Sequence, residues 1–251
     1  MKNDTAQPTG GRLLDLSSAI AGETCKYLEE GSPTRDELQK LIGNKEKVKA
    51  IARKNAHDLL QLISEDTVQA KEALEKYFLE VFGLKLNLSK LTFPVHEGFN
   101  TFMVNPPQLS EDQIMEAFKK KWGINIYTWM TPIASNINRK SEQKRPKGLY
   151  AFAHRGGDEP DQQHLGKSYD DAMGANLTFT IAKEYQLVTG FHRFTKGRFM
   201  DVKGWTRNAS LWSAGHLVRG HGYEASSELD LNYGHRDDRD SGYGPRELVY
   251  A

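Results

Sequence analysis

The residues best suited to chemistry follow a short apolar run at 149–153. His154, Arg155, Gly156 and Gly157 come directly after this run, and Glu159 follows them. Imidazole and carboxylate groups can hold a metal ion that activates water for hydrolysis. An acidic cluster near 228–240 could supply further carboxylates. A metal-dependent hydrolase that uses His154, Glu159 and this cluster is therefore one hypothesis.

The same segment resembles the opening of glycerophosphodiester phosphodiesterases. Glu228 and Asp230 are similar to the later acidic pair of that family, and His235 to its second histidine. The two pieces are much farther apart here than in that family. Only about a hundred residues follow His154, whereas a (β/α)8 barrel needs roughly 250 in all. We therefore keep a phosphodiesterase-like hydrolase as the alternative and favour a simple turn at Arg155, Gly156 and Gly157.

A second set of candidate metal ligands lies near the C-terminus. A calcium-binding EF-hand loop needs acidic residues at alternating positions before a glycine, and the stretch from Asp238 to Gly242 supplies only two, beside arginines. We expect pairs of surface Asp and Arg, no metal and no cofactor. The candidate ligands are His216, His221, His235, Asp237, Asp238 and Asp240.

Nucleophilic and nucleotide chemistry have little support. Cys25 is the single cysteine, which excludes a disulfide framework and a thiolate zinc site. We expect Cys25 to be a small core residue. No Gly-x-Ser-x-Gly elbow occurs, and Gly166-Lys167-Ser168 lacks the earlier glycine of a phosphate-binding loop.

Residues 208–244 instead alternate short apolar pieces with Tyr, Ser, Gly, Asn, Asp, His and Arg. Antibody paratopes use similar residues, since rigid aromatics provide contact area at little entropic cost. A recognition surface is one interpretation, and a polar, solvated loop region is the other. We expect Trp205 in the core and Trp212, Tyr223, Tyr233 and Tyr243 as binding hot spots. The remaining candidates for ligand binding are His216, Arg219, His221, His235, Asp237, Asp238, Arg239 and Asp240.

Three C-terminal segments carry a resemblance: Asp201-Val202-Lys203-Gly204-Trp205-Thr206, the run from Ala209 to Leu217, and the tail Gly244-Pro245-Arg246-Glu247-Leu248-Val249. They resemble the end of bacterial C-type-lectin-fold proteins, the variable proteins of diversity-generating retroelements. The resemblance covers roughly 148–251. It implies a fixed scaffold that closes with a Gly-x-Arg strand and displays diversified residues over 209–246. Calcium-dependent sugar binding is not implied, because the Glu159-Pro160-Asp161 run lies far from the late position of the animal lectins' motif.

The elements around these residues predict an α+β chain. Residues 1–11 are polar and are expected to be a disordered leader. Apolar residues at helical spacing predict a helical segment over 12–83, in which the last helix contains Leu74, Tyr77 and Phe78 and ends at Gly83. The alternating signs of its Lys and Glu residues indicate a solvated exterior.

Residues 84–147 are expected to be a mixed α/β connector. Ser110 and Gln113 form a capping box before a helix that ends at Gly123, and an alternating strand follows. The polar run at 136–147 predicts a basic linker, which sets the start of a C-type-lectin-like domain with short strands at 148–251. In that domain we expect a strand at 149–153, a helix around 181–191, and β pieces at 199–202, 216–219, 229–233 and 246–250.

Composition limits the partners. The formal charge of +1 gives no global field for nucleic acid, and no apolar run is long enough to span a bilayer. We expect a cytoplasmic, non-catalytic binder of a protein or cell-surface ligand, with nucleic acid and membrane insertion disfavoured. A further hypothesis is that the N-terminal helices assemble the chain into an oligomer.

Overall fold

The computed structural model describes residues 67–223 and 228–251. The chain divides into two compact units, 1–68 and 69–251. The expected leader at 1–11, the part of the helical segment before residue 67, and Cys25 lie outside the described residues. The second unit contains both helices and sheets, which confirms the α+β class.

The first described element is a helix over 67–82. Leu74, Tyr77 and Phe78 are fully buried along one side of it. Gly83 ends the helix with a left-handed φ of 65°, and its N–H donates to the Leu79 carbonyl at 3.0 Å. The predicted helix and its end are confirmed.

Helix α4 (Glu111–Trp122) is also confirmed. The Ser110 hydroxyl accepts from the Gln113 N–H at 3.3 Å, and the Gln113 side chain accepts from the Ser110 N–H at 2.8 Å. This reciprocal pair satisfies two backbone donors that a helix start leaves free. Gly123 takes the left-handed conformation at the other end.

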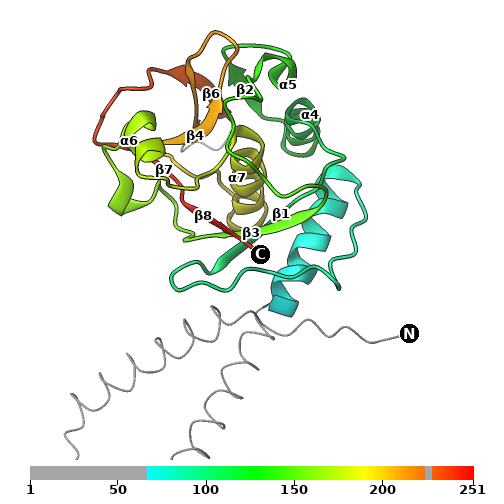
Figure 1. Ribbon diagram of the computed structural model, residues 1–251. Helices are drawn as coiled ribbons and strands as arrows, with labels where there is room; N and C mark the ends of the chain where they lie inside the picture. Colours follow the sequence, from blue (N-terminus) through cyan, green and yellow to red (C-terminus); the bar gives the residue numbers. More distant parts are fainter. Residues whose placement is uncertain (1–66, 224–227) are drawn as a thin grey trace, which may run out of the picture. The chain divides into compact units, whose positions relative to one another are not determined.

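A three-stranded antiparallel sheet has the order β1-β3-β8. Its strands are β1 (Thr101–Asn105), β3 (Tyr150–His154) and β8 (Leu248–Tyr250). Met103 lies opposite Phe152, and Phe152 lies opposite Tyr250. The C-terminal strand therefore ends in the same sheet as residues from the middle of the chain, beside α7 (Figure 1).

A second sheet has five strands in the order β2-β6-β5-β4-β7. The pairs β2–β6 and β4–β7 are parallel, and the two pairs between them are antiparallel. The strands are β2 (Asn125–Thr128), β4 (Trp205–Leu211), β5 (Leu217–Gly222), β6 (Glu228–Gly234) and β7 (Tyr243–Pro245). Strands β1, β4 and β7 were not expected from the sequence, and the piece expected at 199–202 is not a strand.

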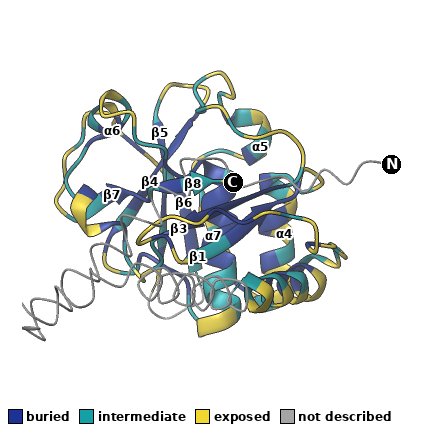
Figure 2. Cartoon of the chain, turned by 60° about the horizontal axis from the view of Figure 1, so that its bottom comes forward, coloured by how far each residue is buried: buried dark blue, intermediate teal, exposed yellow. Residues whose placement is uncertain are grey.

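Helix α7 (Ala182–Lys196) packs against β4, β5, β1 and α4. Two glycines allow α7 to approach β5 and α4 closely. A Cβ on Gly220 of β5 would lie 1.9 Å from the Tyr185 ring of α7, and a Cβ on Gly190 of α7 would lie 2.1 Å from Phe118 of α4. Figure 2 shows the central strands as buried, with exposed residues on outer helix sides and loops. The shorter helices are α5 (Ile133–Asn136), η1 (Gln162–His164) and α6 (Tyr169–Gly174).

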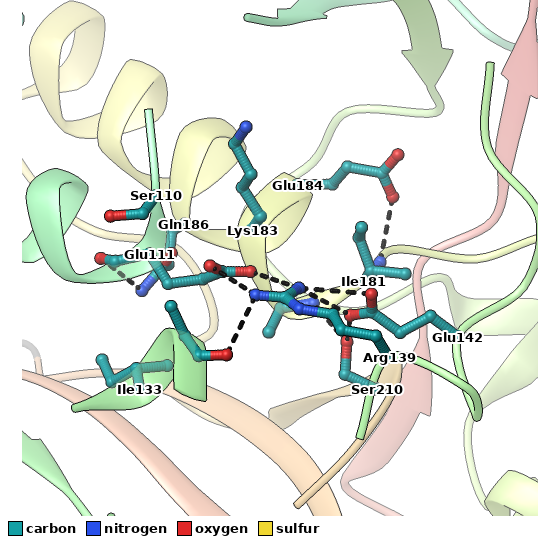
Figure 3. Close-up of polar contacts among 12 residues, drawn as sticks. Ser110, Glu111, Ile133, Arg139, Glu142, Ile181, Lys183, Glu184, Gln186 and Ser210 are labelled. Carbon is teal, nitrogen blue, oxygen red and sulfur yellow. Dashed lines mark hydrogen bonds and ion pairs between the residues drawn. The ribbon is translucent and has the colours of Figure 1, made fainter. Parts of the chain in front are cut away.

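The run at 136–147, expected to be a basic linker, is held against buried acids. Arg139 donates to both oxygens of Glu111, at 2.7 and 2.8 Å, and also contacts Glu142 (Figure 3). Arg145 pairs with Glu184 at 3.0 Å, and both side chains are almost fully buried. Two of the expected linker cations therefore anchor the segment.

The expected domain boundary near 140–147 is corrected for the same reason. Strands from 84–147 pair with strands beyond it, β1 with β3 and β2 with β6. Backbone hydrogen bonds across the boundary join the two parts into one unit over 69–251. Residues 84–147 are therefore part of the same folded unit as the C-terminal strands.

Candidate recognition surface

The five-stranded sheet has two faces of different character. Gly220 and Gly222 on β5 face Tyr185 of α7 and Phe199, respectively. Because side chains alternate along a strand, Arg219 and His221 lie on the opposite face. We call this the outer face and define it by Trp205, Arg207, Arg219, His221, Tyr223 and Tyr243.

Ring contacts join these outer-face residues. The Trp205 and His221 rings stack with centroids 4.6 Å apart and an interplanar angle of 18°. Tyr223 meets His221 edge-on at 4.8 Å. The Arg219 guanidinium lies 4.4 Å from the Trp205 ring centroid and 5.2 Å from that of Tyr243. Rings and cations thus form one continuous surface across β7, β4 and β5.

Two tryptophans occupy the opposite places from those expected. Trp212 was expected to be an exposed hot spot, but it is fully buried and its Nε1 donates to the Asn232 carbonyl at 3.3 Å. Trp205 was expected in the core, but it is only partly buried and stacks on the outer face. Trp212 is therefore removed from the candidate site, and Trp205 is added to it.

Other predicted residues gather in a second group near the end of the same sheet. His216 and Tyr233 lie 5.5 Å apart, and His216 and His235 lie 5.7 Å apart, measured between ring centroids. Trp129, which was not among the predicted residues, contacts Tyr233 at 4.7 Å and His216 at 5.1 Å. Trp129 and Tyr233 are both more than one third exposed.

The loop 235–242, between β6 and β7, carries the remaining predicted residues. Arg239 pairs with Asp171 of α6 at 2.8 Å, and Arg236 pairs with Asp170. Asp237 is exposed, as is Asp240, which accepts from the Gly242 N–H at 2.9 Å. Paired surface Asp and Arg, as expected from the sequence, therefore account for much of this cluster.

Arg207 was not among the site residues predicted from the sequence. It lies opposite Arg219 in the β4–β5 register and is fully buried. Burial, together with the neighbouring Arg219 charge and against the attraction of Asp238, lowers the pKa of Arg207. Trp205 and Arg207 are two residues apart and share a face of β4, but this strand was not predicted from the sequence.

A separate pocket of about 520 Å³ lies beside the loop at 155–165. Asp161 lines it, and its carboxylate belongs to a group with His164 and Glu247 whose candidate ligand atoms lie within 4.8 Å of one another. Cations contact two of these side chains: Glu247 Oε2 is 3.1 Å from Arg155 Nη2, and His164 Nδ1 is 3.0 Å from Lys167 Nζ. His164 Nε2 lies 3.0 Å from Glu247 Oε2, so the group is part of an ion-pair network that includes Arg155 and Lys167.

The surroundings shift the pKa values of Asp161 and Glu247 in opposite directions. Burial raises the pKa of Asp161, although the Glu247 N–H donates to its carboxylate at 2.8 Å. Burial also opposes ionisation of Glu247, but hydrogen bonds from His164 and Arg155 hold its pKa below the ordinary value. Glu247 is thus kept charged by its neighbours.

His154 and Glu159, the two residues named first in the hydrolase alternative, already have hydrogen-bond partners. His154 is buried, and its Nδ1 accepts from the Gly156 N–H at 3.0 Å. Glu159 accepts from the backbone N–H groups of Lys203 and Gly204, at 3.1 and 2.9 Å. Asp230 lies on β6, in the other sheet from His154. These contacts give both His154 and Glu159 structural roles.

No protein-family model, curated protein or solved structure matches this chain.

Within the two ranges that the structure describes, no helix is both long enough and apolar enough to cross a bilayer.

Proposed function

We propose that this chain is a non-catalytic ligand-binding protein that recognises a protein or cell-surface ligand through its outer face. The observation that carries the proposal is Arg219, whose guanidinium lies 4.4 Å from the Trp205 ring centroid and 5.2 Å from that of Tyr243, and whose Nε is buried without a hydrogen-bond partner in the described part of the chain. An arginine fixed on aromatic rings with free N–H groups is suited to bind a partner.

The composition of the outer face supports this proposal. Trp, Tyr and Arg dominate the energetics of known interfaces because they bury large areas while losing little side-chain entropy. Tyr223 is 38% exposed and continues the surface beyond His221. Trp205 and Tyr243 lie opposite each other on paired strands, so backbone hydrogen bonds fix their spacing. The surface is therefore ordered before any ligand binds.

We further propose that residues 148–251 contribute a C-type-lectin-like scaffold, as their resemblance to retroelement variable proteins implies. Gly244 lies in β7, and Arg246 lies between β7 and the last strand, β8. Comparison of codons 208–246 with any near-identical repeat beside the gene tests diversification. Differences concentrated at adenines, beside a reverse transcriptase gene, are expected for a diversified protein, and the absence of such a repeat indicates a fixed ligand.

A binding array tests the proposed function. The fluorescently labelled chain is applied to immobilised glycans and peptides together with the variants Trp205→Ala and Tyr223→Ala. The exposed residues Leu79 and Val95 lie outside the outer face, and Leu79→Ala and Val95→Ala serve as matched controls. We expect ligands that bind the native chain and both controls but lose at least about tenfold in affinity to the two outer-face variants. Binding that ignores Trp205 and Tyr223, or no binding at all, would contradict the proposal.

The hydrolase alternative is tested by metal content. Removal of divalent metal with a chelator should leave array binding unchanged if the outer face acts without a metal. Stoichiometric metal in the purified protein, lost on Glu159→Gln, would favour the alternative instead.

A further inference from the structure

Two arginines meet at one aromatic ring on the outer face. Arg207 and Arg219 are directly opposite on β4 and β5, and their guanidinium carbons lie 5.3 and 5.2 Å from the Tyr243 centroid. Like charges at opposed positions destabilise a sheet. The fold keeps both cations beside each other, so an anion bound between them would relieve this repulsion.

The hydrogen-bonding capacity of these arginines is unused. All three guanidinium nitrogens of Arg207 are buried without an acceptor in the part of the chain that the structure describes, and so is Nε of Arg219. Asp238 Oδ2 lies 3.9 Å from Arg207 Nη1, beyond hydrogen-bond range. Buried charged donors without acceptors are costly. The site therefore lacks an oxygen acceptor that fits the guanidinium geometry.

The loop 235–242 lies beside Arg207 through Asp238. It carries Asp238 and is attached to α6 through Arg236–Asp170 and Arg239–Asp171 (loop between β6 and β7, Figure 1). The four side chains of these pairs are all more than one third exposed, and exposed ion pairs contribute little to stability. Backbone hydrogen bonds from Asp170 to the Arg236 carbonyl, at 3.4 Å, and from Trp205 to the Gly242 carbonyl, at 3.3 Å, also hold the loop, so the two ion pairs themselves add little to its attachment.

We propose that the ligand of the outer face carries an oxyanion, a carboxylate, sulfate or phosphate group, that enters beneath the loop 235–242. It takes the place of the Asp238 carboxylate and accepts hydrogen bonds from Arg207 and Arg219. A planar guanidinium can bind two oxygens of such a group at once. This inference rests on the proposed function, because it names the chemical group that the outer face recognises.

The test is calorimetric titration of the full chain with sodium sulfate, phosphate or acetate at constant ionic strength. Arg219→Gln should weaken binding of the preferred anion by at least about tenfold. Asp238→Asn removes the internal competitor and should tighten binding by about twofold to fivefold. Asp237→Asn makes the same change in net charge on the same loop and should leave affinity unchanged. The three titrants distinguish a tetrahedral anion from a carboxylate.

The titrations either support or overturn an anion site at Arg207 and Arg219. Saturable binding that is lost in Arg219→Gln and strengthened only in Asp238→Asn supports the site. Arg207→Gln gives the same test if it folds, and the other two variants suffice if it does not. The absence of saturable binding, or equal effects of Asp237→Asn and Asp238→Asn, would overturn the inference. If array ligands still need Trp205 and Tyr223 but ignore Arg219→Gln, the anion site is wrong and the proposed function stands.

Discussion

Arg246 and Asp201 form an ion pair of 2.6 Å in which both side chains are fully buried. The pair joins the segment between β7 and β8 to the chain before β4, and Thr206 donates to the second Asp201 oxygen at 2.7 Å. Arg246 also donates to the Gly156 carbonyl at 3.0 Å. One buried pair thus connects both sheets and the loop after β3.

Breaking this pair should be strongly destabilising. Arg246→Met leaves a buried carboxylate, and Asp201→Asn leaves a buried guanidinium, so each is expected to cost about 3–5 kcal/mol of unfolding free energy. Asn keeps the left-handed backbone that Asp201 has, with φ of 59°. Urea unfolding followed by tryptophan fluorescence measures the change. The double variant should be about 2 kcal/mol more stable than additivity predicts, and strict additivity would show that the two charges do not interact.

His154 should make the protein sensitive to acid. Its burial, together with the nearby Arg246 and His192 charges, lowers the pKa from 6.5 to about 3. Because the unfolded chain binds the proton more readily, stability is fully present above pH 6.5 and is lost as the pH falls from 6.5 toward 3. Between pH 6.5 and 5 this loss is about 1–2 kcal/mol.

His154→Asn removes the titrating ring and keeps an acceptor for the Gly156 N–H. Urea unfolding at both pH values should show a fall in stability about 1–2 kcal/mol smaller for the variant than for the native chain. Other histidines titrate in both proteins and cancel in this comparison. Equal falls would mean that His154 is not held neutral by its surroundings.

Local signals in the sequence located several elements correctly. The capping box at Ser110, the end of α4 at Gly123 and the helix end at Gly83 depend on neighbouring residues, and all three are confirmed. Long-range pairing was not visible in the sequence. The residues next to Trp212 do not indicate that it is buried, and those next to Trp205 do not indicate that it is partly exposed. The polar run with Arg139 and Arg145 was taken as a linker because its acidic partners are 28 and 39 residues away.

Trp212 is buried and Tyr223 is partly exposed, so their substitution should affect the free energy of unfolding differently. Trp212→Ala opens a large cavity in the core and should cost about 3–5 kcal/mol. Tyr223→Ala removes a side chain that is 38% exposed and should cost less than about 0.5 kcal/mol. Chemical denaturation of both variants measures the difference. A loss for Tyr223→Ala as large as that for Trp212→Ala would mean that Tyr223 belongs to the scaffold and not to a binding surface.

The packing of α7 on β5 predicts a specific sensitivity at Gly220. A methyl group there would overlap the Tyr185 ring, so Gly220→Ala should lose about 1–3 kcal/mol or more. Gly174 ends helix α6, and a methyl group on it would meet no neighbouring atom within 4 Å, so Gly174→Ala is the matched control. The control should be neutral or more stable by up to about 1 kcal/mol. Thermal unfolding compares the two, and equal stability would contradict the close approach of Tyr185.

The central claim, that the outer face binds ligands through arginines that lack hydrogen-bond acceptors, is tested most directly by arginine side-chain NMR. Nitrogen-15 arginine signals are followed while the anion preferred in calorimetry is added at constant ionic strength. The structure predicts saturable shifts of Arg207 and Arg219 with one common dissociation constant. Arg145, which is held by buried Glu184, should not move. Small shifts spread over exposed arginines such as Arg198 and Arg236, with none at Arg207 or Arg219, would contradict the account.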